Sequence, residues 1–272
     1  MGLFWRCWVL SRWIEHQVWL GAAQAGVTMV AALVVVWLTG RLKLGMKKEI
    51  LISLGRGVVQ IVLVGFLLTV IFSADMWIAV PVILVMIAAG SVMTIQRVRD
   101  IPNALKISAL GITAGAGLVI TLMTFLGVIK QDLTSIIPIG SMMVYGAMNT
   151  NALMMERFRS ELTAHAGQIE AGLALGASPE QVVSPYTRRA VTAALTPNIN
   201  GLRSLGIVWI PGAMAGMVLT GENPAYAGFY QFVVSGSIFV TAVITVLVSI
   251  ILLRKQVFSP AEQLLLRAED GQ

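Results

Sequence analysis

Residues 226–253 read YAGFYQFVVSGSIFVTAVITVLVSIILL, a run that holds no charged side chain. A helix that rises about 1.5 Å per residue crosses the roughly 30 Å hydrocarbon core of a bilayer in about twenty residues. Membrane β-strands are runs of about ten residues that alternate in polarity, and this run does not alternate. The stretch therefore predicts a membrane-spanning helix.

The composition of the whole chain agrees with this prediction. Of its 272 residues, 57% are hydrophobic and 12% are charged, and the mean hydropathy is +0.84. A soluble domain carries about a quarter charged residues, enough to cover a core with a water-facing surface. These proportions exclude an ordinary soluble protein and a disordered chain, and they indicate a polytopic membrane protein.

Further apolar runs of similar length predict an all-α, polytopic helical fold with about seven transmembrane helices. We expect the spans at 18–39, 50–72, 77–95, 107–129, 133–155, 197–220 and 226–253. Residues 1–17 are rich in tryptophan and include charged residues, so they are predicted to be an interfacial segment. The transmembrane domain is then 18–255, with a cytoplasmic excursion at 156–196, and 256–272 form a cytoplasmic tail.

Basic residues set the expected orientation, because cytoplasmic loops of membrane proteins collect lysine and arginine. One side would carry Arg41, Lys43, Lys47, Lys48, Arg97, Arg99, Lys106, Arg157, Arg159, Arg188, Arg189, Arg254, Lys255 and Arg267. The other side would carry only Arg6, Arg12 and Lys130. This places the N-terminus outside and the C-terminus in the cytoplasm. It also explains the net charge of +6 without a nucleic-acid partner.

The longest polar excursion, 156–196, has the local chemistry of a helix–turn–helix. Gly176 suits the left-handed residue that ends a helix. Ser178 suits an N-cap, with Pro179 at the first helical position and Gln181 at the third, as in a capping box. Such a turn can dock into a groove on a partner, or it can be an ordinary connection between helices.

Several stretches of the chain match a known family. Glu170-Ala171-Gly172 followed by Gly176 resembles the EAA loop of bacterial ABC-transporter permeases, and residues 134–235 resemble the Fet-type iron-export permeases, whose plant relatives are linked to aluminium tolerance. The matching residues are Arg56 with Gln60, Gln168-Ile169-Glu170, Leu173-Ala174-Leu175-Gly176-Ala177-Ser178-Pro179, Ala193-Ala194-Leu195 with Pro197, Gly206-Ile207-Val208, Ile210-Pro211-Gly212-Ala213-Met214-Ala215-Gly216, Gly221, Pro224 and Tyr230-Gln231.

The resemblance implies the permease subunit of an ATP-driven exporter of iron or another metal ion. It implies a permease homodimer and a separate cytoplasmic P-loop ATPase that binds ATP and magnesium. Coupling would use Glu170, Ala171, Gly172, Leu175, Gly176, Ala177, Ser178 and Pro179. The chain itself has no G-x-x-x-x-G-K-[ST] motif, so we expect a non-catalytic subunit with no cofactor of its own. It departs from the family at 141–146, where Tyr145 and Gly146 replace the usual Gly and Asn.

A second set of residues could face a transport path: Arg56, Gln60, Met142, Met148, Asn149 and Met214. Arg56 and Gln60 share a helix face, although an arginine at this depth can also reach the cytoplasmic interface. Thioethers suit soft metal ions, and methionine also fills gaps between helices, so the metal remains unknown.

Two glycine pairs and one proline predict features of helix packing. Gly111 with Gly115, and Gly212 with Gly216, have the small-xxx-small spacing that allows close helix approach. Pro211 and Gly212 in mid-span interrupt the backbone ladder, so Pro211, Gly212 and Gly216 are predicted to form a hinge.

The energy source has two alternatives at this stage. No Asp or Glu lies inside a predicted span, whereas proton-driven carriers commonly use intramembrane acids. This favours an ATPase partner. The alternative is an ATPase-independent channel or ion-driven carrier, or ABC export of a non-metal metabolite. A membrane enzyme is disfavoured, because the sequence shows no cluster of catalytic residues.

Overall fold

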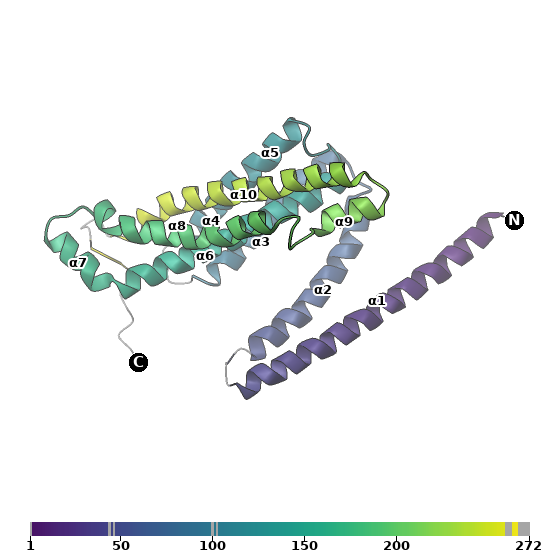
Figure 1. Cartoon of the computed structure of the whole chain (residues 1–272), viewed down its shortest axis with the longest axis horizontal. Helices are drawn as coiled ribbons and strands as arrows, with labels where there is room; N and C mark the ends of the chain where they lie inside the picture. The colour runs from purple at the N-terminus through teal and green to yellow at the C-terminus, as the bar shows by residue number, and fades with distance from the viewer. Residues whose placement is uncertain are drawn as a thin grey trace. The chain divides into compact units, whose positions relative to one another are not determined.

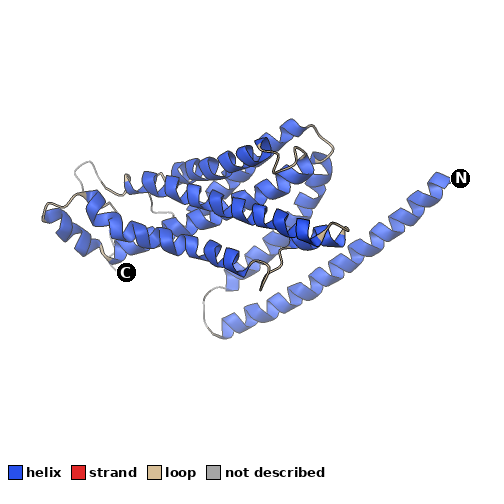
Figure 2. Cartoon of the chain, turned by 45° about the horizontal axis from the view of Figure 1, so that its top comes forward, coloured by secondary structure: helices blue, strands red, loops and turns tan. Residues whose placement is uncertain are grey.

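The computed structural model describes residues 2–42, 45, 47–98, 101, 103–258 and 263–265, without the side chains of residues 2–18 and Ala22. Most of the predicted cytoplasmic tail therefore lies outside the described residues. Within the described ranges every regular element is a helix, as Figure 2 shows. The predicted all-α fold is confirmed. The chain divides into two compact units, residues 1–73 and 74–272.

The first unit is a pair of long helices, α1 (Gly2–Arg41) and α2 (Lys47–Ile71), which contact each other. The guanidinium of Arg41 lies 4.5 Å from the ring centroid of Trp37, a cation–π contact at the end of α1. The helical backbone begins at Gly2, so it includes the predicted interfacial segment. Most described side chains of both helices are exposed and apolar, as expected for surfaces in contact with lipid.

The second unit is a helical bundle. Its long helices run side by side, with α7 at one end and α9 at the other (Figure 1). In chain order its elements are η1 (Met76–Ile78), α3 (Ala79–Ile95), α4 (Ala104–Ile112), the π-helical η2 (Thr113–Gly117), α5 (Leu118–Phe125), α6 (Leu133–Ala164), α7 (Ala166–Ala174), α8 (Pro179–Ser204), α9 (Gly212–Leu219) and α10 (Pro224–Arg254).

Five helical segments are long and apolar enough to cross a membrane: Trp19–Arg41, Lys47–Ile71, Met76–Ile95, Ala104–Phe125 and Pro224–Arg254. They coincide with five of the predicted spans. The predicted span 133–155 lies inside α6. The chain is therefore a polytopic helical membrane protein, and a total of seven spans stays a prediction.

The predicted span 197–220 is not one helix, and this expectation is corrected. Helix α8 runs through Pro197 and ends at Ser204, and α9 begins at Gly212. Between them Gly206 takes a φ of +77°, and Pro211 is the extended N-cap of α9. A left-handed glycine and a proline without an N–H both interrupt a helical hydrogen-bond ladder, which accounts for the break.

Close packing joins α10 to the α4–η2 segment. A Cβ atom at Gly111 or Gly115 would collide with the hydroxyls of Ser249 or Thr245, so only glycine permits this approach. The prediction for this pair is confirmed. A Cβ at Gly212 or Gly216 would meet nothing within 4 Å, so the second pair makes no such close approach in the described chain.

The main core lies toward the end of the bundle that carries α7. It joins α7 with the halves of α6, α8 and α10 that lie nearest to it, through side chains that are almost fully buried. Its members include Phe158, Leu162, Ile169, Val183 and Leu253. This core fixes the region predicted to couple the protein to an ATPase.

Candidate coupling site

Helix α6 carries the coupling region away from the predicted membrane edge. It continues nine residues beyond 155 to Ala164, which adds about 13 Å of helix. His165 ends it with a φ of −118°, while its N–H donates to the carbonyl oxygen of Glu161 at 3.2 Å. The chain then turns into α7.

Helix α7 is held against the bundle by one apolar and one polar anchor. Ile169 is fully buried in the main core. The side-chain oxygen of Gln168 accepts a hydrogen bond from the Tyr186 hydroxyl of α8 at 3.2 Å. A Cβ at Gly172 would lie 3.3 Å from the Val182 side chain, so the small residue lets α7 approach α8 closely. The α7–α8 pair is thus a packed unit.

The turn between α7 and α8 has both predicted caps. Gly176 is left-handed, with a φ of +87°. Its N–H donates to the carbonyl of Leu173 at 3.0 Å, and the N–H of Ala177 donates to the carbonyl of Gly172 at 3.1 Å. These two hydrogen bonds form a Schellman motif. Ser178 and Gln181 then form the reciprocal capping box. Both helix-end predictions are confirmed.

The tip of this turn presents an apolar side chain to solvent. Leu175 is 89% exposed, although it lies between two capped helix ends. Glu170, Ala171 and Gly176 are exposed beside it, whereas Gly172 and Pro179 are half-buried. An exposed leucine on a rigid turn has the shape and chemistry to insert into a groove of a protein partner.

Two ion pairs tie this region to its neighbours. Glu161 of α6 lies 3.3 Å from Arg189 of α8. Glu180, in the first turn of α8, lies 3.8 Å from Arg254 at the end of α10. Exposed pairs of this kind contribute about 0–1 kcal/mol each, so packing rather than charge holds the unit together.

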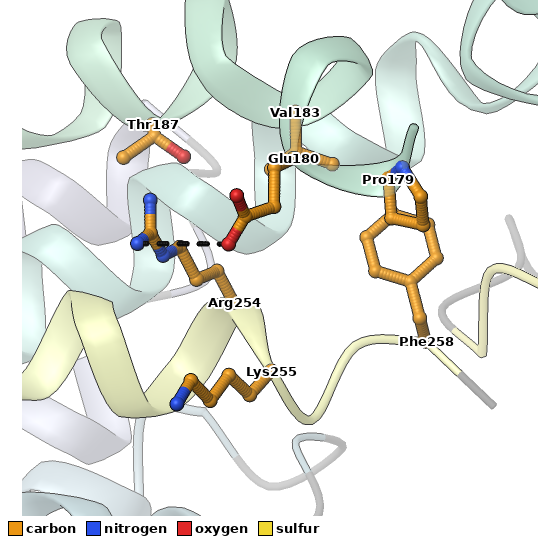
Figure 3. Close-up of a pocket in the computed structure, with 7 residues that line it drawn as sticks. All are labelled: Pro179, Glu180, Val183, Thr187, Arg254, Lys255 and Phe258. Carbon is orange, nitrogen blue, oxygen red and sulfur yellow. Dashed lines mark ion pairs between the residues drawn. The ribbon is translucent and has the colours of Figure 1, made fainter. Parts of the chain in front are cut away.

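The Glu180–Arg254 pair borders a small pocket of about 190 Å³ between α8 and the end of α10. In Figure 3 the two charged groups point toward each other, while Phe258 lies beside Pro179. Sequence reasoning missed this junction. The available signals were an acid in the first turn of α8 and an arginine that ends a long apolar run, but nothing local pairs two residues so far apart.

The predicted transport-path residues are divided between the two units. Arg56 and Gln60 are exposed on α2, in the first unit. In the second unit Met148 packs against α3, within 3.5–3.7 Å of a Cβ built at Gly90, and Met214 of α9 packs near Gly228 of α10. These contacts fit the gap-filling interpretation of both methionines. Met142 and Asn149 are exposed.

Two other amides, of Asn151 and Asn198, form hydrogen bonds between helices. Asn151 is fully buried and donates to the hydroxyl of Ser108 at 3.1 Å, and Asn198 of α8 donates to Thr150 at 2.9 Å. Among the described residues, no group of three or more His, Cys, Asp or Glu could hold a metal ion. The hinge role of Pro211, Gly212 and Gly216 stays a prediction, placed at an observed helix break.

Comparison with known proteins now adds the family. Residues 22–258 match the model of UPF0014, described as an uncharacterised protein family. The chain belongs to this family. It is 31% identical over 254 residues to the UPF0014 membrane protein STAR2 of Oryza sativa subsp. japonica, covering 93% of this chain and 88% of that one.

Two further relatives have descriptive names. The Protein ALUMINUM SENSITIVE 3 of Arabidopsis thaliana is 29% identical, covering 90% of each chain. The Probable iron export permease protein FetB of Escherichia coli is 28% identical, covering 88% of this chain and 92% of that one. No solved structure matches. This UPF0014 protein is thus a multi-pass membrane protein of a family that includes a relative named a probable iron export permease.

Proposed function

We propose that this protein is the membrane-spanning permease subunit of an ATP-driven ABC exporter in a bacterial cytoplasmic membrane. The α7–α8 turn docks into a separate cytoplasmic P-loop ATPase, and two copies of the permease pair. The exposed Leu175 on a doubly capped turn carries the proposal. A large apolar side chain held in water is stabilised only when a partner covers it and removes its surface from water.

Helix α8 supplies a route from the turn into the membrane. It continues as one helix for 26 residues, about 39 Å, from Pro179 to the break that precedes α9, although Pro185 and Pro197 each remove one backbone hydrogen bond. Closure of the ATPases on ATP and magnesium moves Leu175, and α8 transmits the movement as a rod. The non-helical stretch 205–211 then lets α9 change its angle, which is the hinge predicted at Pro211, Gly212 and Gly216.

The proposed substrate is a metal ion, with iron as the first candidate. The name of the FetB relative refers to iron export, and that of an Arabidopsis relative refers to aluminium. Iron and aluminium are metals that oxygen-rich sites can bind. The changed residues Tyr145 and Gly146 lie on α6, so the choice of metal should be tested against several ions.

The test uses the permease together with a P-loop ABC ATPase of the same organism, reconstituted in proteoliposomes. Leu175→Asp is compared with Leu219→Asp. The two leucines have similar exposed fractions, 89% for Leu175 and 87% for Leu219, and they lie at opposite ends of the bundle. Burial of a leucine contributes about 1.5–3 kcal/mol, so Leu175→Asp should weaken ATPase association roughly tenfold to a hundredfold.

The expected result is loss of metal-stimulated ATP hydrolysis and of ATP-dependent export in Leu175→Asp, with both retained in Leu219→Asp. Normal coupling in Leu175→Asp would contradict the docking role of the turn. Export by the permease alone, without ATP, would instead favour a channel or an ion-driven carrier.

A further inference from the structure

Helix α8 alone cannot set the angle of α9. It ends at Ser204, and α9 begins only at Gly212, after the non-helical stretch 205–211. A short non-helical stretch absorbs changes of φ and ψ as a hinge does, so it allows α9 to turn without directing the turn. Another element has to direct it.

Helix α10 has the length and the contacts for this role. It is continuous for 31 residues, about 46 Å, which is longer than the roughly 30 Å hydrocarbon core of a bilayer. Its single proline, Pro224, occupies the first helical position, where proline leaves the hydrogen-bond ladder intact. Near this start α10 contacts α9, since a Cβ built at Gly228 would lie 3.8 Å from the Cε of Met214. A movement of α10 therefore reaches α9 directly.

The other end of α10 meets the first turn of α8, directly after the coupling turn. Arg254 lies 3.8 Å from Glu180, and Phe258 lies beside Pro179 (Figure 3). We call Pro179, Glu180, Arg254 and Phe258 the α8–α10 joint. The acid stands at the positive end of the α8 dipole and the arginine at the negative end of the α10 dipole. The joint thus pairs two helix ends of opposite polarity.

The α8–α10 joint leaves room for movement. Its N–O distance of 3.8 Å is longer than a hydrogen bond. The Nε of Arg254 is buried and has no hydrogen-bond partner, so the guanidinium keeps a donor for a closer contact. A pocket of about 190 Å³ lies between the two helix ends. Protein interiors are close-packed, so this space lets the helix ends approach or separate without a collision.

Between its two ends, α10 packs on the α4–η2 segment through small groups. Gly111 faces Ser249, and Gly115 faces Thr245. The hydroxyls of Thr245 and Ser249 are buried and have no hydrogen-bond partner within the described chain, so no such bond from them fixes the register of this contact. Small groups form shallow ridges, which oppose a lengthwise shift of α10 less than large side chains do.

We propose that the α8–α10 joint connects the coupling turn to α10, so that α10 is a second lever beside α8 and directs α9. Glu180 and Arg254 are positioning residues, because they act through α10 and touch neither the ATPase nor the substrate. The inference rests on the proposed ATPase docking, and it adds the route by which the movement crosses the membrane.

Charge reversal at the joint tests the proposal. Glu180→Arg and Arg254→Glu each place like charges opposite each other, and the double reversal restores an opposite pair. Lys255→Glu is the matched control, since it makes the same charge change at the next residue and no acid among the described residues pairs with Lys255. Glu180→Gln covers the case in which a reversal fails to fold, because that side chain is 73% exposed and keeps its size.

The full permease is reconstituted in proteoliposomes with a P-loop ABC ATPase of the same organism, and iron(II) is the probe ion. Three quantities are measured: the adduct from a photo-crosslinking amino acid at position 175, ATP hydrolysis, and the ions exported per ATP. Both single reversals should keep the adduct and the hydrolysis, while export per ATP falls about tenfold. Glu180→Gln should lower export to a lesser degree. The double reversal and Lys255→Glu should export as wild type does.

Equal export per ATP in wild type and both single reversals would overturn the proposal, and so would a double reversal that exports no better than the single ones. Loss of the adduct in a single reversal would also overturn it, because Glu180 and Arg254 would then act in docking. A wild type that binds no ATPase, or that exports without ATP, would contradict the proposed docking itself, and the joint would be rejected with it.

Discussion

Gly176 has a left-handed backbone conformation, and the α7–α8 turn requires this conformation. Its φ is +87°, and the two hydrogen bonds that close α7 depend on this geometry. A residue with a Cβ is strained by roughly 1–2 kcal/mol in this region. The turn that presents Leu175 therefore depends on a single glycine.

Gly176→Ala should destabilise the protein by about 1 kcal/mol, because it adds strain that the wild type lacks. Gly167→Ala, at a helical position of α7 with open space around it, should be neutral or slightly stabilising. Thermal unfolding in detergent compares the two variants. Equal midpoints would show that the conformation of Gly176 does not matter to the fold.

At the scale of elements, the start of α6 depends on its N-cap. The Asp132 carboxylate accepts hydrogen bonds from the Thr134 hydroxyl and from the Ser135 N–H, both at 2.7 Å. The hydrogen bond from Thr134, followed by those from Ser135, lowers the pKa of Asp132 below its usual 3.8. The carboxylate therefore stabilises the folded state at neutral pH, and this contribution is lost as the pH falls through the lowered folded-state pKa.

Asp132→Ala should cost about 1 kcal/mol of stability at pH 7. The difference from wild type should persist down to about pH 4 and shrink at more acidic pH, because the unfolded carboxyl titrates near 3.8 and the folded one below it. Asp75→Ala is the control, since Asp75 precedes η1 without a side-chain capping bond. Unfolding of both variants followed across pH 3–7 checks this; an equal loss in Asp75→Ala would rule out the cap as the cause.

The elements also show what the sequence can predict. The α7–α8 turn was predictable because Gly176, Ser178 and Gln181 act on their own backbone within a few residues. The break before α9 was predictable only in part: Pro211 marked it, but α8 extends through Pro197 to Ser204. The apolar pocket between α3 and η2–α5 was not predictable, because it depends on how these helices pack, and no local signal in the sequence records that.

At the scale of the whole molecule, the few charges define an orientation. Within the second unit, Arg97, Lys106, Arg157, Arg189 and Arg254 lie at the helix ends nearest α7, so the turns at 73–76 and 130–132 are predicted to lie outside. In a Cys7→Ser background, a membrane-impermeant maleimide should label Lys130→Cys in intact spheroplasts. It should label Arg188→Cys only after permeabilisation. The reverse pattern would invert the topology and move the coupling turn to the wrong side for an ATPase.

The orientation joins the proposals into one arrangement. The α7–α8 turn is predicted to face the cytoplasm, and α8 connects it to the helix break that precedes α9. The proposed transport cycle depends on ATPase docking, because without a docked ATPase neither the exposed Leu175 nor the movement of α8 has a function.

The most direct measurement of that docking places a photo-crosslinking amino acid at position 175 in cells that also produce the candidate P-loop ABC ATPase. The same amino acid is placed at position 219 for comparison. The account predicts a covalent adduct between the permease and the ATPase from position 175 and none from position 219. No adduct from position 175, or equal adducts from both positions, would contradict it.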